Sequence, residues 1–121
     1  MRSWNLTELD APAGTRDPIV LETADGTRAV MLAIAPGQEL REHEVKERAW
    51  VTVVEGRARF ESGGESVDAG AGMLFTFAPS ERHSIASESG ARILLILAPW
   101  PGDGHYRAEE KAVSGADFVG P

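Results

Sequence analysis

The chain of 121 residues contains no cysteine, and this absence excludes disulfides, thiolate metal sites and a cysteine nucleophile. Positive charge is in the minority: the net charge is −7, and its sign would repel a phosphate backbone, so we expect no nucleic-acid partner. No apolar run approaches the roughly 20 residues of a membrane span. Residues 1–5 lack the apolar stretch of a signal peptide. These absences predict a cytoplasmic protein with no membrane contact.

Turn-forming residues are frequent, with 13 glycines and 7 prolines separating short apolar and β-branched runs. No long stretch shows the 3.6-residue apolar period of a helix, so the pattern is all-β. The predicted strands cover residues 18–23, 28–35, 49–55, 57–61, 73–77, 83–87 and 91–98. The first two are joined by a turn at residues 24–27 and form a hairpin. Eight or so short strands in this length favour a closed barrel or a sandwich.

The chain length fits one domain with a single core. We assign residues 1–98, with the N-terminal strands, to this domain. The composition changes after residue 98, and residues 99–121 are predicted to be a C-terminal tail packed on it, with a short helix at residues 107–113 as an option. The prediction is thus one β domain with a short C-terminal extension.

Two segments carry recognisable motif spacing. In the first, Gly37 is followed by His43, and in the second Gly72 is followed by Pro79 and His83. The spacing resembles the two signature motifs of the cupin family over about residues 28–98. The resemblance implies a small single-domain cupin, RmlC-like, with an antiparallel β-barrel of jelly-roll type.

The resemblance also implies where a metal would bind. Metal-holding cupins use three histidines and one glutamate for a divalent iron, manganese, nickel or zinc ion. His43 and His83 match two of these positions, whereas Val45 and Ala49 replace the second histidine and the glutamate. We therefore expect no cofactor at full occupancy and at most a weakly held ion, with Glu47, or His105 in the tail, as the replacement ligand.

Alternation of side chains along a strand predicts which residues face the barrel interior. Glu47, Ala49, Val51 and Val53 share one face, and the resemblance makes this the inner face. Trp50 then faces outward, in a core or interface position.

The predicted binding residues line the pocket inside the barrel or lie at its rim. They are Arg41, Val45, Glu47, Ala49 and Val51, with Arg41 on the face of His43 if its strand is regular. Arg41, Lys46 and Arg48 form a cationic group that suits a carboxylate or phosphate, or is simply solvated.

Three classes of function remain open. The first is a non-catalytic cupin that binds a small molecule in an apolar pocket containing His43 and His83, which Val45 and Ala49 favour. The second is a metal-dependent oxygenase-like enzyme with an altered ligand set. The third is a metal-independent isomerase or cyclase in which His43 or His83 is the catalytic acid or base.

Two expectations concern neighbouring surfaces. Residues 100–106 combine two aromatic rings and an imidazole with glycines, and they either form a lid over the barrel mouth or dock on the outer sheet. Small cupins commonly pair through edge strands, so the resemblance also implies a homodimer.

Overall fold

The computed structural model describes residues 1–10 and 18–102, and within them it contains eight strands and no helix. All pairings are antiparallel. The strands are β1 (Ile19–Ala24), β2 (Thr27–Ile34), β3 (Gln38–His43), β4 (Arg48–Ser62), β5 (Glu65–Gly70), β6 (Leu74–Phe77), β7 (His83–Ser87) and β8 (Ala91–Ala98). This confirms the predicted all-β jelly-roll fold. Within the same residues, no helix is long and apolar enough to cross a membrane.

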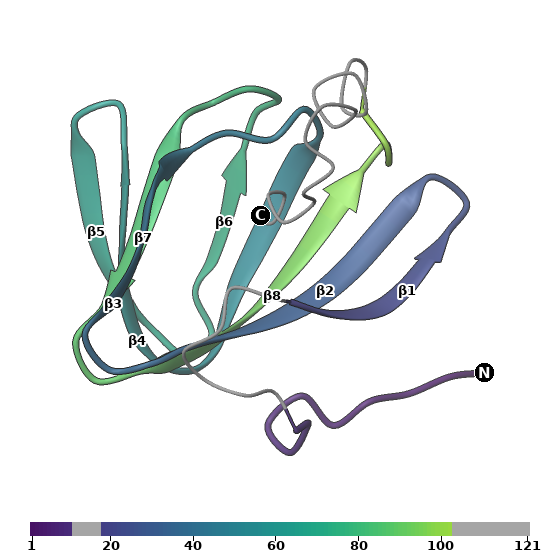
Figure 1. Cartoon of the computed structure of the whole chain (residues 1–121), viewed down its shortest axis with the longest axis horizontal. Coiled ribbons are helices and arrows are strands. Elements are labelled where there is room, and N and C mark those ends of the chain that lie inside the picture. The colour runs from purple at the N-terminus through teal and green to yellow at the C-terminus, as the bar shows by residue number, and fades with distance from the viewer. Residues whose placement is uncertain (11–17, 103–121) are drawn as a thin grey trace.

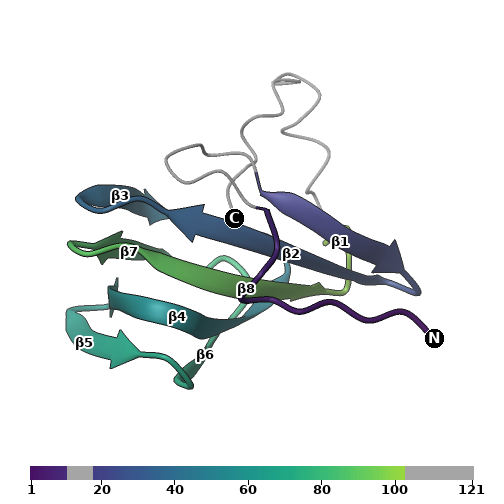
Figure 2. The same ribbon diagram turned by 90° about the horizontal axis from the view of Figure 1, so that it is seen from below.

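The sheet has the strand order β1-β2-β8-β4-β7-β3, and β5 and β6 also pair with β4. It curls so that β3, β7 and β5 lie on one side and β1, β2 and β8 on the other (Figures 1 and 2). Strand β4 belongs to both parts: its first half pairs with β6 and β8, and its second half pairs with β5 and β7.

The continuity of β4 corrects one prediction. The sequence predicts two strands, at residues 49–55 and 57–61, but one strand continues through Gly56, with a register shift between Val53 and Glu55. Gly56 has a φ of 85°, and a Cβ there would lie 2.2 Å from the carbonyl oxygen of Gly90. A glycine is therefore required where β4 passes from one part of the sheet to the other.

The barrel interior is filled by the alternate residues of the strands. Along β4, Ala49, Val51 and Val53 are buried and join the core, as the period of two predicts. The remaining buried members come mainly from β2, β7 and β8, among them Val30, Leu32, Ile34, Ile85, Ile93, Leu95 and Leu97. Trp50 points outward and is 42% exposed, in agreement with the predicted face.

The first hairpin also forms as predicted. Asp25 and Gly26 both have positive φ values, of 49° and 74°. Two consecutive residues of this kind give a turn whose twist suits a two-residue hairpin. The turn lies at the same end of the barrel as the end of β8, which places it beside the chain that leaves the barrel (Figure 1).

Candidate functional site

The loop end of the barrel brings together the two histidines of the motifs. His43 is the last residue of β3 and His83 is the first of β7, and the two are Cα partners in the sheet. Their ring centroids lie 4.4 Å apart, with the ring planes tilted by 58°. Positions 40 residues apart in the sequence therefore form one imidazole pair.

Backbone carbonyl groups hold both rings in the same way. The Nδ1–H of His43 donates to the carbonyl oxygen of Arg41 at 2.8 Å, and the Nδ1–H of His83 donates to that of Glu81 at 3.0 Å. A carbonyl oxygen only accepts, so Nδ1 carries the proton in each ring. In the neutral form Nε2 then has the lone pair. The Nε2 of His43 is buried and has no hydrogen-bond partner among the described residues.

His83 lies in an apolar setting. It is 3% exposed, and its ring stacks on Phe77 at 4.0 Å between centroids. Burial lowers the pKa of His83, the hydrogen bond to the Glu81 carbonyl partly opposes this, and the neighbouring His43 lowers it further. The neutral ring, with Nε2 as a base or acceptor, is thus the favoured form.

A tight turn places the carbonyl that holds His83. Ser80 has a left-handed φ of 65°, and Glu81 accepts hydrogen bonds from the backbone N–H of Ala78 and from the hydroxyl of Ser62. These bonds, the backbone one first, lower the pKa of Glu81. The turn is closed by its own side chain, which keeps the Glu81 carbonyl against His83.

A bulge in β3 corrects the predicted position of Arg41. Leu40 pairs with Ile85 and His43 pairs with His83, so β3 has one residue more than β7 between these pairs. Leu40 and His43 consequently both turn inward, whereas Arg41 is exposed. The shared face of Arg41 and His43 required a regular strand, and the strand is not regular.

The other predicted pocket residues lie on the inner face or next to it. Ala49 and Val51 are buried in the core, and Ala49 is the Cα partner of Phe77, which stacks on His83. Val45 is half-buried and packs against the same core from the link between β3 and β4. These residues make the surroundings of the histidine pair apolar.

Glu47 is completely buried, at 0% exposure, just before β4 begins. Its Oε2 accepts a hydrogen bond of 2.7 Å from the backbone N–H of Gly102, beyond the end of β8. The inward direction of Glu47 agrees with the predicted face. Its bond to the C-terminal segment was not foreseen.

A complete metal site does not fit the described residues. They contain no group of three or more histidine, aspartate or glutamate side chains placed to hold one ion. His43 and His83 supply two imidazoles, and one oxygen of Glu47 is bonded to Gly102. His105, the other proposed ligand, lies outside the described residues, as do Tyr106 and the helix expected at residues 107–113.

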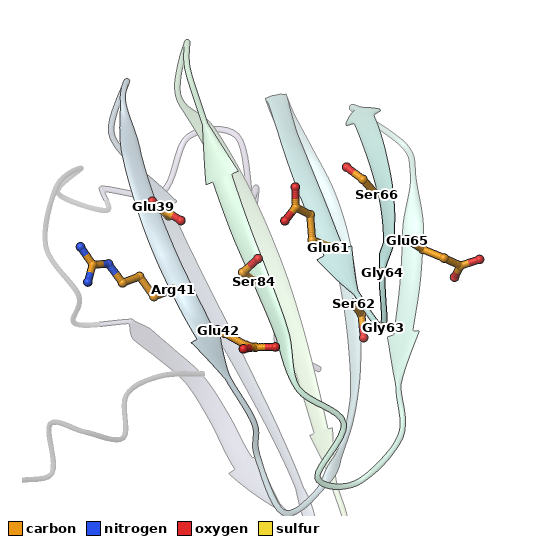
Figure 3. Close-up of a pocket in the computed structure, with 10 residues that line it drawn as sticks. All are labelled: Glu39, Arg41, Glu42, Glu61, Ser62, Gly63, Gly64, Glu65, Ser66 and Ser84. Carbon is orange, nitrogen blue, oxygen red and sulfur yellow. The ribbon is translucent and has the colours of Figure 1, made fainter.

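A separate hollow of about 550 Å³ lies on the outer side of β3, β7, β4 and β5 (Figure 3). It is lined by Glu39, Arg41, Glu42, Glu61, Ser62, Gly63, Gly64, Glu65, Ser66 and Ser84. Four of these side chains are carboxylates and one is a guanidinium, so its lining is acidic. Arg41 therefore faces this hollow and not the histidine pair.

Two contacts of the site could not be predicted from the sequence. Phe77 stacks on His83, but an aromatic residue in an apolar strand is ordinary core composition. Gly102 binds Glu47, but a glycine in a tail rich in glycine and proline carries no signal of its own. Both depend on contacts between residues far apart in the chain.

Comparison with known proteins adds family membership. The family model described as "Cupin domain" matches residues 30–97, more than half of the chain. No curated protein matches.

Several solved structures share the fold. An uncharacterised conserved protein with a double-stranded β-helix domain from Klebsiella pneumoniae is 21% identical, with a TM-score of 0.72 over 85% of this chain and 94% of the other. An RmlC-like cupin from Desulfovibrio desulfuricans is 22% identical, with a TM-score of 0.69 over 82% and 97%. A proposed mannose-6-phosphate isomerase from Ralstonia eutropha is 21% identical, with a TM-score of 0.69 over 81% and 98%.

Proposed function

This chain belongs to the cupin family, and we propose that it binds a small organic molecule at the barrel end that carries His43 and His83. The observation that carries the proposal is the fixed orientation of both rings. Each Nδ1–H is held by a backbone carbonyl, so the two Nε2 atoms are the groups offered to a ligand. A pair of acceptors against apolar walls suits a ligand with a hydroxyl or acid group on an apolar body.

Binding without catalysis is favoured over a metal-dependent reaction. Val45 and Ala49 supply no ligand atom, and Glu47 already accepts a hydrogen bond from the chain. Two imidazoles form a weak site for a transition metal. We therefore propose that a divalent zinc, nickel, iron or manganese ion, if present in purified protein, is held substoichiometrically.

A metal-independent isomerase or cyclase is the second candidate. The lowered pKa of His83 keeps its Nε2 available as a general base. The similar fold of the proposed mannose-6-phosphate isomerase from Ralstonia eutropha supports this candidate. In this case the bound molecule would be a substrate that gives up a proton to His83 and regains it at another atom.

The test is a ligand screen with the full chain. Thermal shift against small organic acids, sugars and phenolics, in metal-free buffer, identifies compounds that stabilise the protein. The same compounds are then titrated into His43→Phe and His83→Phe, which keep a ring but remove the nitrogens. The proposal expects at least about a tenfold loss of affinity in each variant, the usual effect of removing a buried hydrogen-bond partner. Unchanged affinity in both variants would contradict it.

Elemental analysis separates the binding and metal-dependent classes. Protein purified without a His tag and dialysed against a chelator should hold much less than one ion per chain. One tightly held ion per chain would overturn the metal-free proposal. Product analysis by NMR after long incubation with each stabilising compound then distinguishes a substrate from a ligand.

A further inference from the structure

After β8 the chain continues along the end of the barrel, from the β1–β2 hairpin to the residues just before β4. The backbone N–H of Trp100 donates to the carbonyl oxygen of Gly26 at 2.7 Å, and the guanidinium of Arg28 lies 4.4 Å from the centre of the Trp100 ring. The Trp100 side chain is half-buried and packs against the core. Residues 99–102, which we call the strap, are thus held on the β1–β2 hairpin at one side.

The other attachment of the strap is the Glu47 carboxylate. Gly102 is buried and its N–H donates to Oε2 of Glu47 at 2.7 Å. Bonds of this kind, from a backbone N–H to a buried carboxylate, are among the stronger hydrogen bonds in proteins. A Cβ at position 102 would lie 2.7 Å from the carbonyl oxygen of Lys46, so only glycine fits this contact.

The strap is attached to the same link that carries the histidine pair. His43 and Glu47 stand at the two ends of the short link between β3 and β4. Val45, within the link, packs against the core together with Trp100. The carbonyl oxygen of Val45 also accepts a hydrogen bond from the N–H of Ser80, in the turn that precedes His83. A movement of the link would therefore displace both histidines and the strap.

We propose that the strap is a latch on the histidine site: the Glu47–Gly102 hydrogen bond keeps the barrel end closed, and its release opens the way to the Nε2 atoms of His43 and His83. This rests on the proposed function insofar as the site is the one that takes the ligand. In this proposal the role of the buried Glu47 carboxylate is to hold the chain's own segment at residues 99–102. Ligand entry and release of the strap are then coupled, because a closed strap and an entering molecule use the same end of the barrel.

The chemical reactivity of the two histidines reports how often the strap is released, and this measurement does not require the ligand to be known. Diethyl pyrocarbonate acylates uncharged imidazole nitrogen, which here is Nε2 in both rings. The full chain is treated at neutral pH, and peptide mass spectrometry gives a separate rate for each histidine. Gly102→Ala should raise the rates at His43 and His83 at least about tenfold, because loss of one charged hydrogen bond shifts a local opening equilibrium by about this factor or more.

Two matched variants of Glu47 keep the test independent of the glycine. Glu47→Met fills a similar volume but has no acceptor, and it should raise the same rates as Gly102→Ala. Glu47→Gln retains an oxygen acceptor and should stay near the wild-type rates. The variant with both Gly102→Ala and Glu47→Met should be no more reactive than Glu47→Met alone, since the bond between residues 47 and 102 is already absent there.

Gly72→Ala controls for general loss of stability. Gly72 has a φ of 99°, and nothing lies within 4 Å of the Cβ that this change adds, so it strains the backbone without touching the strap. Its histidine rates should match wild type. Equal rates in wild type, Gly102→Ala and Glu47→Met would overturn the latch, and so would a rise in Gly72→Ala as large as that in Gly102→Ala.

The outcome is separable from that of the proposed function. If the latch variants expose the histidines but no compound needs His43 or His83 for binding, the latch stands and the proposed function fails. If compounds bind through the histidines with the same association rate in wild type and Gly102→Ala, the proposed function stands and the latch fails. Association rates are measured by stopped-flow with the tightest compound from the screen.

Discussion

His83 and Phe77 are stacked, with ring centroids 4.0 Å apart and planes within 8° of parallel. One of the two site histidines is therefore also a packing residue of the barrel. His43 has a different setting, since it is half-buried and its Nε2 has no partner among residues 1–10 and 18–102. The two imidazoles should respond differently to mutation.

Replacement by alanine should separate these two settings. His83→Ala leaves a cavity beside Phe77 and should lower the free energy of unfolding by about 2–3 kcal/mol. His43→Ala removes one hydrogen bond to a backbone carbonyl and should cost about 1 kcal/mol. Both proteins should remain folded. Urea unfolding followed by circular dichroism gives the two values, and equal losses would contradict the packing role of His83.

Stability should depend on pH through His83. Its pKa in the folded state is below the ordinary value of 6.5, so between these two values the unfolded chain binds more protons than the folded one. The free energy of unfolding should therefore fall as the pH is lowered below about 6.5 and should level off below the folded pKa. Denaturation at a series of pH values measures this slope.

The carboxyl group of Glu81 changes stability in a different pH window from the His83 imidazole. The pKa of Glu81 is below its ordinary value of 4.5, so its contribution is present above pH 4.5 and is lost as the pH falls through the folded pKa. His83→Gln should remove the loss that begins near pH 6.5 and keep the acid one. Glu81→Gln should do the opposite. A slope below pH 6.5 that survives in His83→Gln would have another source.

Restoring the replaced ligands should create a metal site. In Val45→His with Ala49→Glu, a carboxylate is added on the buried inner face and an imidazole in the link beside the histidine pair. The metal-free variant should be less stable than wild type, because a buried carboxylate is costly. Nickel or zinc at about a hundred times Kd should return about 2.7 kcal/mol. The control, Val45→His with Ala49→Gln, has the same size without the charge, and melting with and without metal compares them.

The expected homodimer has a testable surface on the outer side of the barrel. Trp50 is 42% exposed and Leu74 is 57% exposed, on neighbouring strands β4 and β6. We predict that Leu74→Glu weakens dimerisation at least about tenfold, because a charge would be buried without a partner. Val67→Glu, on β5 where the side chain is 41% exposed, is the control and should remain dimeric. Sedimentation velocity over a concentration series decides, and a monomeric wild type would refute the dimer.

Two glycines of equal backbone conformation should differ in their tolerance of alanine. Gly56 and Gly64 have φ values of 85° and 86°, so the conformational cost of alanine is about 1–2 kcal/mol in both. At Gly56 the added Cβ meets the Gly90 carbonyl, whereas at Gly64 it meets nothing within 4 Å. Gly56→Ala should thus lose about 1–3 kcal/mol more than Gly64→Ala. Equal losses in thermal melts would mean that the Gly90 loop moves freely.

Periodicity predicted the parts of the site that lie on regular strands. Ala49, Val51 and Val53 alternate with exposed or half-buried neighbours, and extending the alternation by one step placed Glu47 inside. The motif spacing, in turn, predicted that His43 and His83 meet. The first inference uses the alternation of side chains along a strand, and the second uses motif positions that are the same throughout the family. A single sequence was therefore enough to make both.

Irregular backbone was not predictable in the same way. The bulge before His43 places Arg41 on the opposite face from the predicted one. The sequence does not indicate a bulge there, because Arg41 and Glu42 are both polar and exposed. The passage of β4 through Gly56 was read as a turn, since a glycine after a strand usually marks one. The bond between Gly102 and Glu47 depends on the closed barrel, and it becomes visible only when all eight strands are in place.

The order of the strands has a consequence for synthesis of the chain. Within residues 1–10 and 18–102, the second neighbour of β2 is β8, with Arg28 opposite Leu97, and the one partner of β3 is β7. A nascent chain that ends before residue 83 therefore holds β3 without its partner β7, and β2 with β1 but without β8. Long-range antiparallel pairing of this kind folds slowly and leaves apolar edges open meanwhile. On the ribosome, the barrel closes only after nearly the whole domain has emerged.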